Sequence, residues 1–231
     1  MACSCCTFDV TADQQFTREK VAKELQRYRR KGLGRTARLL RDGLAVARLT
    51  SGTFIDVGAG VAGLTLALLD QGMTRGTVVE ASAAYLAAAS EETARRGRSA
   101  FVQFMQGDYV TVGPQVPVAT VVTLDRVVCC YPFCEPLIQQ AARHADRAVA
   151  LSYPRDRWYV RMGMWLENAM RRRRGNPFRT FVHPPAQIQQ LLEQAGFELA
   201  SRRRTVTWSA DVFVRRSRAT HSTIHQPIDP M

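Results

Sequence analysis

Residues 53–63 read Thr-Phe-Ile-Asp-Val-Gly-Ala-Gly-Val-Ala-Gly. The apolar start is typical of a buried strand, and residues 61–71 have the apolar content of a helix. Gly58 and Gly60 let the chain turn sharply between the two, and they let a ligand approach the backbone where a Cβ atom would collide. In open α/β folds such a turn lies at the carboxyl edge of the sheet, where ligands bind. The stretch therefore predicts a ligand site at the glycine turn.

Strands and helices alternate on both sides of this stretch. Strands are predicted at 53–57, 76–80, 101–106, 119–124 and 147–153. Helices are predicted at 61–71, 83–96, 135–145, 155–174 and 185–195, with two more ahead of the sheet at 15–30 and 35–49. Residues 197–203 and 205–214 resemble a closing hairpin. We predict an α/β, doubly wound, seven-stranded and mostly parallel sheet, with a C-terminal antiparallel hairpin and N-terminal helices.

The chain has the size and composition of one folded domain. It has 231 residues, of which 46% are hydrophobic, enough to fill a core. No repeat or linker divides it. We therefore expect an N-terminal helical extension over 1–50, the main domain over 51–216 and a disordered tail over 217–231.

Carboxylates stand at the predicted carboxyl ends of several strands. Asp56 precedes the glycines, where it would repel a diphosphate but favour a cation. Glu80 ends the second strand and can accept both hydroxyls of a ribose, a feature that fits NAD equally well. Asp108 ends the third strand, where it can accept from an adenine amino group, and Asp125 ends the fourth. Together they favour S-adenosylmethionine (SAM) over NAD or FAD.

These motifs resemble those of class I SAM-dependent methyltransferases, which have a Rossmann-like fold. The resemblance covers about residues 50–214 and lies in I-D-V-G-A-G-V-A-G, V-V-E-A-S and Q-G-D-Y. Ala59 stands where many relatives have Gly or Cys. The resemblance implies SAM as cofactor and S-adenosylhomocysteine (SAH) as product. The cofactor-binding residues it implies are Asp56, Gly58, Ala59, Gly60, Gly63, Glu80, Ala81, Gly107, Asp108, Tyr109, Leu124 and Asp125.

The C-terminal half is more loosely similar to the magnesium-protoporphyrin O-methyltransferase branch. The similar stretches are Leu-Ser-Tyr-Pro at 151–154, then His183, Ile188, Leu191 and Ala-Gly-Phe at 195–197. This likeness assigns no substrate.

The predicted chemistry is an in-line displacement that aligns donor and acceptor and, for a protonated acceptor, removes a proton. The catalytic candidates are His183, Asp125 and Tyr131. His183 is the best base because histidine titrates near neutrality, although a loop histidine before Pro-Pro is also typical of a hydrogen-bonding or capping residue. Arg126 and Arg155 are candidates for holding an anionic group, or for ion pairs with Asp125 and Asp156.

The basic residues behind the formal net charge of +12 are nearly all arginines, and these form clusters at 27–31, 171–174, 202–204 and 215–218. A solvated basic surface explains them, and so does attraction to nucleic acid, anionic lipid or an acidic substrate. Between two of the clusters, Trp158, Met162 and Trp165 have helical spacing. Such a stripe is typical of core packing and also fits a lid.

Cysteine content predicts no metal site. Cys3, Cys5 and Cys6 form a terminal group, and Cys129, Cys130 and Cys134 a second, but no pair of matching C-x-x-C motifs exists. Free thiols at a frayed terminus are favoured for the first group, and Cys129 and Cys130 are expected to be buried. Because no apolar run is long enough to span a membrane and no signal peptide is recognisable, a cytoplasmic location is expected.

The leading functional hypothesis is a SAM-dependent methyltransferase acting on a small, partly apolar or anionic molecule. An RNA methyltransferase using the arginine clusters is the second hypothesis, although an N-P-P-Y-like motif is missing after the fourth strand. The third is a non-catalytic SAM-binding protein, and the fourth an NAD-dependent reductase. A small-molecule partner is expected and a nucleic acid is not.

Overall fold

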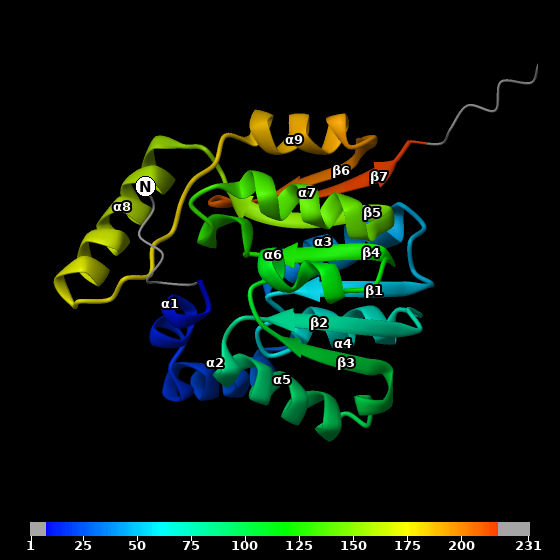
Figure 1. The fold of residues 1–231 in the computed structure, drawn as a ribbon, viewed down its shortest axis with the longest axis horizontal. Helices are drawn as coiled ribbons and strands as arrows, with labels where there is room; N and C mark the ends of the chain where they lie inside the picture. The colour runs from blue at the N-terminus through cyan, green and yellow to red at the C-terminus, as the bar shows by residue number, and fades with distance from the viewer. Residues whose placement is uncertain (1–7, 217–231) are drawn as a thin grey trace, which may run out of the picture.

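The computed structural model describes residues 8–216 of the 231-residue chain. Seven strands form one sheet in the order β3-β2-β1-β4-β5-β7-β6 (Figure 1). The strands are β1 Thr53–Val57, β2 Arg75–Glu80, β3 Val102–Gln106, β4 Ala119–Asp125, β5 Ala145–Pro154, β6 Phe197–Arg204 and β7 Trp208–Arg215. Strands β1 to β5 are parallel, and β7 is antiparallel to β5 and β6. The predicted fold is confirmed.

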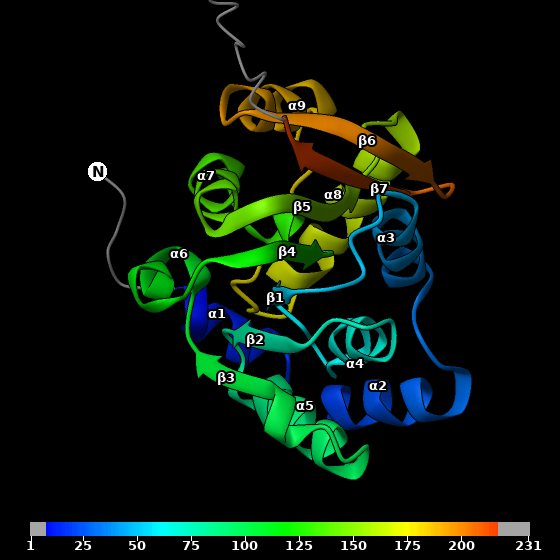
Figure 2. The same ribbon diagram turned by 90° about the vertical axis from the view of Figure 1, so that its right-hand side faces the viewer.

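Helices cover both faces of the sheet (Figure 2). The α-helices are α1 Phe8–Gln15, α2 Arg18–Lys31, α3 Arg35–Val46, α4 Gly63–Asp70, α5 Ala83–Arg95, α6 Tyr109–Val112, α7 Cys134–His144, α8 Trp158–Arg173 and α9 Pro185–Gln194. Short 3-10 helices lie at Ser99–Phe101, Gly113–Gln115 and Val128–Cys130. One core cluster joins the sheet to α7 and α9, and another joins it to α3 and α4. Burial of these two apolar layers is the main source of stability.

Helix α3 belongs to the sheet layers, although it falls within the predicted N-terminal extension. Its Leu40 and Leu44 are fully buried in the cluster under β5 and β7. Its Gly43 lies so close to Val212 of β7 that an added Cβ would come within 2.8 Å of a Val212 methyl group. Helix α2 instead packs on α5, with Val21 in a third cluster. Helix α2 therefore covers the glycine turn, because its Val21 and Leu25 share this cluster with Val61.

Most predicted boundaries lie within a few residues of the observed ones, and the differences have local causes. Residues 8–15 form a separate helix, α1, ahead of the predicted helix at 15–30; the sequence predicts helix from residue 10 onward, but the weak apolar periodicity gives no bounds for it. Helix α8 begins at Trp158 rather than at 155, because Arg157 has an extended backbone, with φ −132° and ψ 145°. The predicted tail at 217–231 lies outside the described residues.

Helix α8 does not pack its large apolar side chains into the core. Trp158 is 73% exposed, Met162 57% and Trp165 69%. The core-packing interpretation of this stripe is therefore wrong. The helix lies beyond the carboxyl ends of the strands, at the left of Figure 1. Within residues 8–216, no helix combines the length and apolar content that crossing a bilayer requires.

Candidate functional site

The turn after β1 requires glycine for two different reasons. Gly58 has φ +61°, and a Cβ there would lie 2.6 Å from a methyl group of Val127. Gly60 has φ +56°, and a Cβ there would make an ordinary van der Waals contact with the ring of Tyr85, at 3.8 Å. Conformation alone therefore favours glycine at 60, whereas crowding also excludes other residues at 58. The two positive-φ glycines thus fix the path of the turn, and the approach of a ligand to its backbone stays a prediction.

Asp56 lies beneath this turn and is fully enclosed. The hydroxyl of Thr65 in α4 donates to one carboxylate oxygen at 2.6 Å, and that of Thr123 in β4 donates to the other at 2.7 Å. Burial raises the pKa of Asp56 to about 6, although both hydroxyls favour the charged form. The carboxylate thus ties β1 to α4 and β4. Its direct contact with a cofactor stays a prediction.

Glu80 connects the end of β2 to the turn. One carboxylate oxygen accepts from the backbone N–H of Gly60 at 3.1 Å, and the other from that of Ser82 at 3.0 Å. The residue is 6% exposed, and burial, with a smaller contribution from nearby Asp56, raises its pKa to about 7. Each carboxylate oxygen retains a lone pair, so the group can still accept hydroxyls from a ligand.

Negative charge gathers around the turn. Asp125 accepts from the hydroxyls of Ser152 at 2.6 Å and Thr36 at 3.2 Å, and burial raises its pKa. Asp125 in turn contributes to the raised pKa of Asp56, so the two carboxylates are electrostatic neighbours. Glu24 of α2 adds to the raised pKa of Asp125, whereas the cation of Arg126 opposes it. A site surrounded by these carboxylates favours a cationic ligand.

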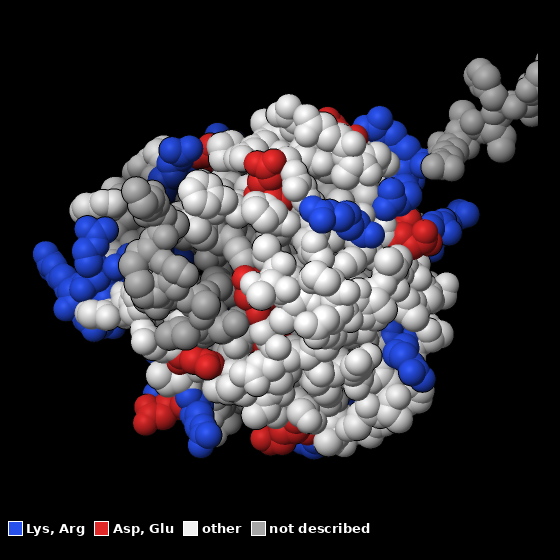
Figure 3. All heavy atoms as spheres, viewed as in Figure 1, with Lys and Arg blue, Asp and Glu red and all other residues white. Residues whose placement is uncertain are grey.

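Asp108 opens onto a cavity of about 400 Å³. It caps the N-terminus of α6, where its carboxylate accepts from the backbone N–H of Val110 at 3.2 Å and from the hydroxyl of Thr111 at 3.2 Å. The hydroxyl of Tyr131 donates to the same group. The cavity walls are mainly apolar and comprise Thr11, Asp108, Val110, Cys130, Tyr131, Pro132, Phe133, Pro136, Pro177, Phe178, Arg179 and Phe181. In Figure 3, acidic atoms are visible in the hollow of this face and the Lys and Arg side chains lie around its periphery.

Two of the three catalytic candidates lie together. His183 is 8% exposed, and its Nε2 lies 2.9 Å from the carbonyl oxygen of Tyr131. Because a carbonyl only accepts, Nε2 carries the proton and a neutral ring has Nδ1 as its acceptor. His183 thus holds the segment after β4 that presents Tyr131 to Asp108, as the hydrogen-bonding alternative predicts. Asp125 lies apart, bonded to Ser152 and Thr36.

The remaining predicted cofactor residues fall into two groups: some are buried in the core, and the others lie in the turns after β1 and β3. Tyr109 is buried, and its hydroxyl lies 2.7 Å from Nδ1 of His144. Leu124 is fully buried, and Ala81 is buried beside Glu80. Tyr109 and Leu124 therefore expose almost no surface to a ligand, and their contact with a cofactor stays a prediction. Ala59 and Gly63 complete the first turn, and Gly107 has φ +144° in the turn after β3.

Four hydroxyl groups of the site are not predicted by the sequence. They belong to Thr36, Thr65, Thr123 and Ser152, and each donates to a carboxylate at the end of β1 or β4. Thr65 and Thr123 are polar residues inside otherwise apolar runs. That contrast is the one signal that could have identified them, because a buried hydroxyl requires a partner.

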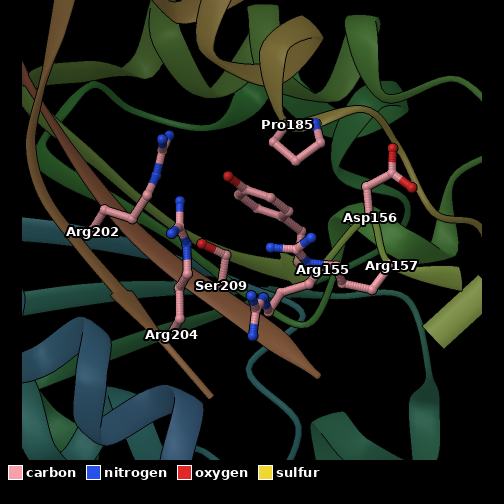
Figure 4. Close-up of a pocket in the computed structure, with 8 residues that line it drawn as sticks. Arg155, Asp156, Arg157, Pro185, Arg202, Arg204 and Ser209 are labelled. Carbon is pink, nitrogen blue, oxygen red and sulfur yellow. The ribbon is translucent and has the colours of Figure 1, made fainter. Parts of the chain in front are cut away.

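A second, smaller cavity of about 140 Å³ lies beside the β6–β7 hairpin and is basic (Figure 4). Its lining includes Arg155, whose guanidinium donates to the carbonyl oxygens of Thr205 and Val206. The guanidinium of Arg126 lies over the ring of Trp208, 5.0 Å from its centre. Among the ion pairs of the described residues, neither arginine pairs with an aspartate. The ion-pair alternative for both is therefore wrong.

Within residues 8–216, no cluster of three or more potential ligands surrounds a metal position. Cys129 is buried and Cys130 half-buried, with free thiols. The terminal cysteines Cys3, Cys5 and Cys6 lie outside the described residues.

The overall architecture is that of known methyltransferases. No family model matches the chain, and no curated protein does either. Among solved structures, the magnesium protoporphyrin IX methyltransferase from Synechocystis PCC 6803 with bound SAM is 16% identical, with 93% of this chain and 100% of that chain covered and a TM-score of 0.64. An O-methyltransferase family protein from Burkholderia thailandensis is 14% identical, with 89% of this chain and 61% of that chain covered and a TM-score of 0.69.

A third similar structure is an O-methyltransferase from neocarzinostatin biosynthesis, in complex with SAH and 1,4-dihydroxy-2-naphthoic acid. It is 18% identical, with 90% of this chain and 60% of that chain covered and a TM-score of 0.59. At such identities the likeness establishes the fold. The bound molecules are properties of those proteins.

Proposed function

We propose that this protein is a SAM-dependent methyltransferase that acts on a small, partly apolar or anionic molecule. The observation that carries the proposal is the ring of carboxylates around the glycine turn. Asp125 adds to the raised pKa of Asp56, Asp56 adds to that of Glu80, and Glu24 of α2 adds to that of Asp125. This field favours a sulfonium and an ammonium group and opposes the diphosphate of NAD or FAD. The charge pattern therefore supports SAM rather than a dinucleotide.

The remaining groups fit an adenosyl ligand. Glu80 has lone pairs for the two ribose hydroxyls, and Asp108, at the neighbouring strand end, can accept from the adenine amino group. The apolar walls of the larger cavity suit a flat ring. Asp56 contributes indirectly in this account, because its bonds to two threonines hold the glycine turn in place.

When bound, SAM supplies an electrophilic methyl group, and the chain aligns an acceptor with it. We assign the acceptor to the space bounded by Tyr131, Phe178 and Phe181, whose mainly apolar walls suit an apolar molecule placed next to the methyl group. For a phenol or an amine acceptor, a base must take a proton. His183 has an unprotonated Nδ1 in its neutral form, and Tyr131 is the other polar group on the same segment. A carboxylate acceptor needs no base.

Turnover distinguishes this proposal from its alternatives. The purified chain is incubated with SAM and, separately, with phenols, aromatic carboxylic acids and amines, and SAH is quantified. We expect SAH above background with at least one class and its loss in Glu80→Gln. SAM binding without turnover on any class would instead support a non-catalytic binding protein. Methylation of RNA but of no small molecule would support the RNA alternative.

A further inference from the structure

Helix α8 carries an apolar stripe on the side that faces away from the protein. At 100° per residue its members fall within one sector of the helix. They are between 43% and 73% exposed, and they are Trp158, Met162, Trp165, Leu166 and Met170. Exposed tryptophans and methionines in such a continuous stripe mark an interaction surface rather than scattered surface residues.

The opposite side of α8 is fixed to the protein. Val160 is buried, and the side-chain amide of Asn168 donates to the carbonyl oxygen of Thr180 at 2.7 Å. Arg171 donates to Asn168 and to the hydroxyl of Thr180, both at 3.1 Å. In the first turn, on the same side as the stripe, the Tyr159 hydroxyl donates to the carbonyl oxygen of Val206 in the β6–β7 turn at 2.8 Å. Because the inner side of α8 is already packed on the protein, the outward stripe is the part of the helix that can contact another molecule or a membrane.

Positive charge borders the stripe. Residues 156–174 contain six arginines and two acidic residues, a net charge of +4. Figure 3, viewed as Figure 1, shows Lys and Arg side chains gathered over this helix. The exposed arginines are Arg157, Arg161, Arg172, Arg173 and Arg174. The charge continues beside the first turn of the helix into the basic cavity of Figure 4, which Arg157 and Arg204 line.

We propose that α8 docks this protein on an anionic membrane surface. The outward apolar stripe enters the boundary between headgroups and acyl chains, and the arginines contact lipid phosphates. A helix with a bulky aromatic stripe and basic flanks has the composition of interfacial helices. A second copy of the chain fits less well, because two +4 surfaces would face each other. This inference is independent of the proposed methyl transfer.

Vesicle sedimentation of the full chain tests the proposal. Vesicles of phosphatidylcholine are compared with vesicles containing about one third phosphatidylglycerol, and the bound fraction is measured. We expect binding to the anionic vesicles, weakened by salt, and little binding to neutral ones. A blue shift of tryptophan fluorescence should accompany it, because Trp158 and Trp165 enter an apolar medium.

Two variants separate the apolar and the charged contributions. W158S/W165S should lower the partition coefficient by roughly ten-fold or more. R172Q/R173Q should lower it by about five-fold for each arginine. The matched controls are V46S/V118S, two exposed apolar residues elsewhere, and R143Q/R147Q, two exposed arginines near the start of β5. Both controls should bind as the unmodified chain does, and all variants should fold because the changed residues are exposed.

Several outcomes would overturn the proposal. One is the absence of binding to anionic vesicles. Another is equal loss of binding in the control variants. A third is a dimer in light scattering that W158S/W165S dissociates, without vesicle binding, which would assign the stripe to a second copy of the chain.

Discussion

Glu80→Gln keeps the size and shape of this side chain and removes its negative charge. The carboxylate accepts from the backbone N–H groups of Gly60, which is half-buried, and of Ser82, which is buried, whereas glutamine offers one acceptor oxygen. Leaving one of these two N–H groups without an acceptor lowers the free energy of unfolding by about 1–3 kcal/mol. In the opposite direction, burial raises the pKa of Glu80 from 4.5 to about 7, so removing the charge recovers roughly 3 kcal/mol near pH 8. The two effects nearly cancel, and we expect the variant to fold.

The effect on cofactor binding should be much larger. Two ribose hydroxyls that donate to a carboxylate form charge-assisted hydrogen bonds, each worth about 1.5–3 kcal/mol. Exchanging them for bonds to a neutral amide should cost about 2–4 kcal/mol in total, which corresponds to an affinity for SAH lower by roughly 30- to 1000-fold.

Isothermal titration of SAH into both proteins near pH 8 measures this loss. Glu91→Gln is the matched control, because Glu91 lies exposed on α5 and pairs with Arg29 at the surface. The control should bind SAH as the unmodified protein does. If Glu80→Gln folds and binds SAH within about three-fold of the unmodified protein, the role assigned to Glu80 is refuted.

The unmodified protein and Glu80→Gln should also differ in how their affinity for SAH and their stability depend on pH. The ligand binds the ionised carboxylate, so affinity for SAH should fall as the pH falls below about 7, approaching ten-fold per pH unit, and should be flat in Glu80→Gln. Without ligand, the stability of the fold changes with pH in the opposite direction from the affinity for SAH. A carboxyl with a raised pKa stabilises the fold below its unfolded value of 4.5, and this contribution is lost as pH rises through about 7. Thermal unfolding should show the variant gaining stability relative to the unmodified protein between pH 5 and pH 8.

Three further substitutions test individual contacts. Gly58→Ala places a methyl group 2.6 Å from Val127 at a positive φ, so it should lower stability by about 1–3 kcal/mol in urea unfolding and abolish SAH binding; unchanged binding would count against the turn. Thr65→Val removes one hydroxyl from the buried carboxylate beneath the turn and should cost about 1–3 kcal/mol, whereas a neutral effect would show that this bond is unimportant. Tyr131→Phe removes one hydroxyl donor from the carboxylate of Asp108, which keeps its bonds to Val110 and Thr111, and should change SAH affinity less than about ten-fold while lowering turnover; full turnover would exclude Tyr131 from the acceptor site.

The architecture could be predicted because its signals are local. The strand at 53–57 has the predicted bounds, since the apolar run ends at a glycine. The glycine turn, Glu80 and Asp108 were located by their positions at strand ends, and parallel strands bring such ends to one edge.

The contacts within the site could not be predicted, because they join residues distant in sequence. The bond between Thr123 and Asp56 links residues 67 positions apart, and that between Thr36 and Asp125 links residues 89 apart. Periodicity also misled at α8: a stripe at helical spacing shows that one side of a helix is apolar but does not show what covers it.

The central claim is that the acidic surroundings of the glycine turn select a cationic adenosyl ligand. Its most direct test is calorimetric titration of the unmodified protein with SAM and, under identical conditions, with NAD⁺. We predict saturable binding of SAM and no heat beyond dilution for NAD⁺. Tighter binding of NAD⁺ than of SAM would contradict it.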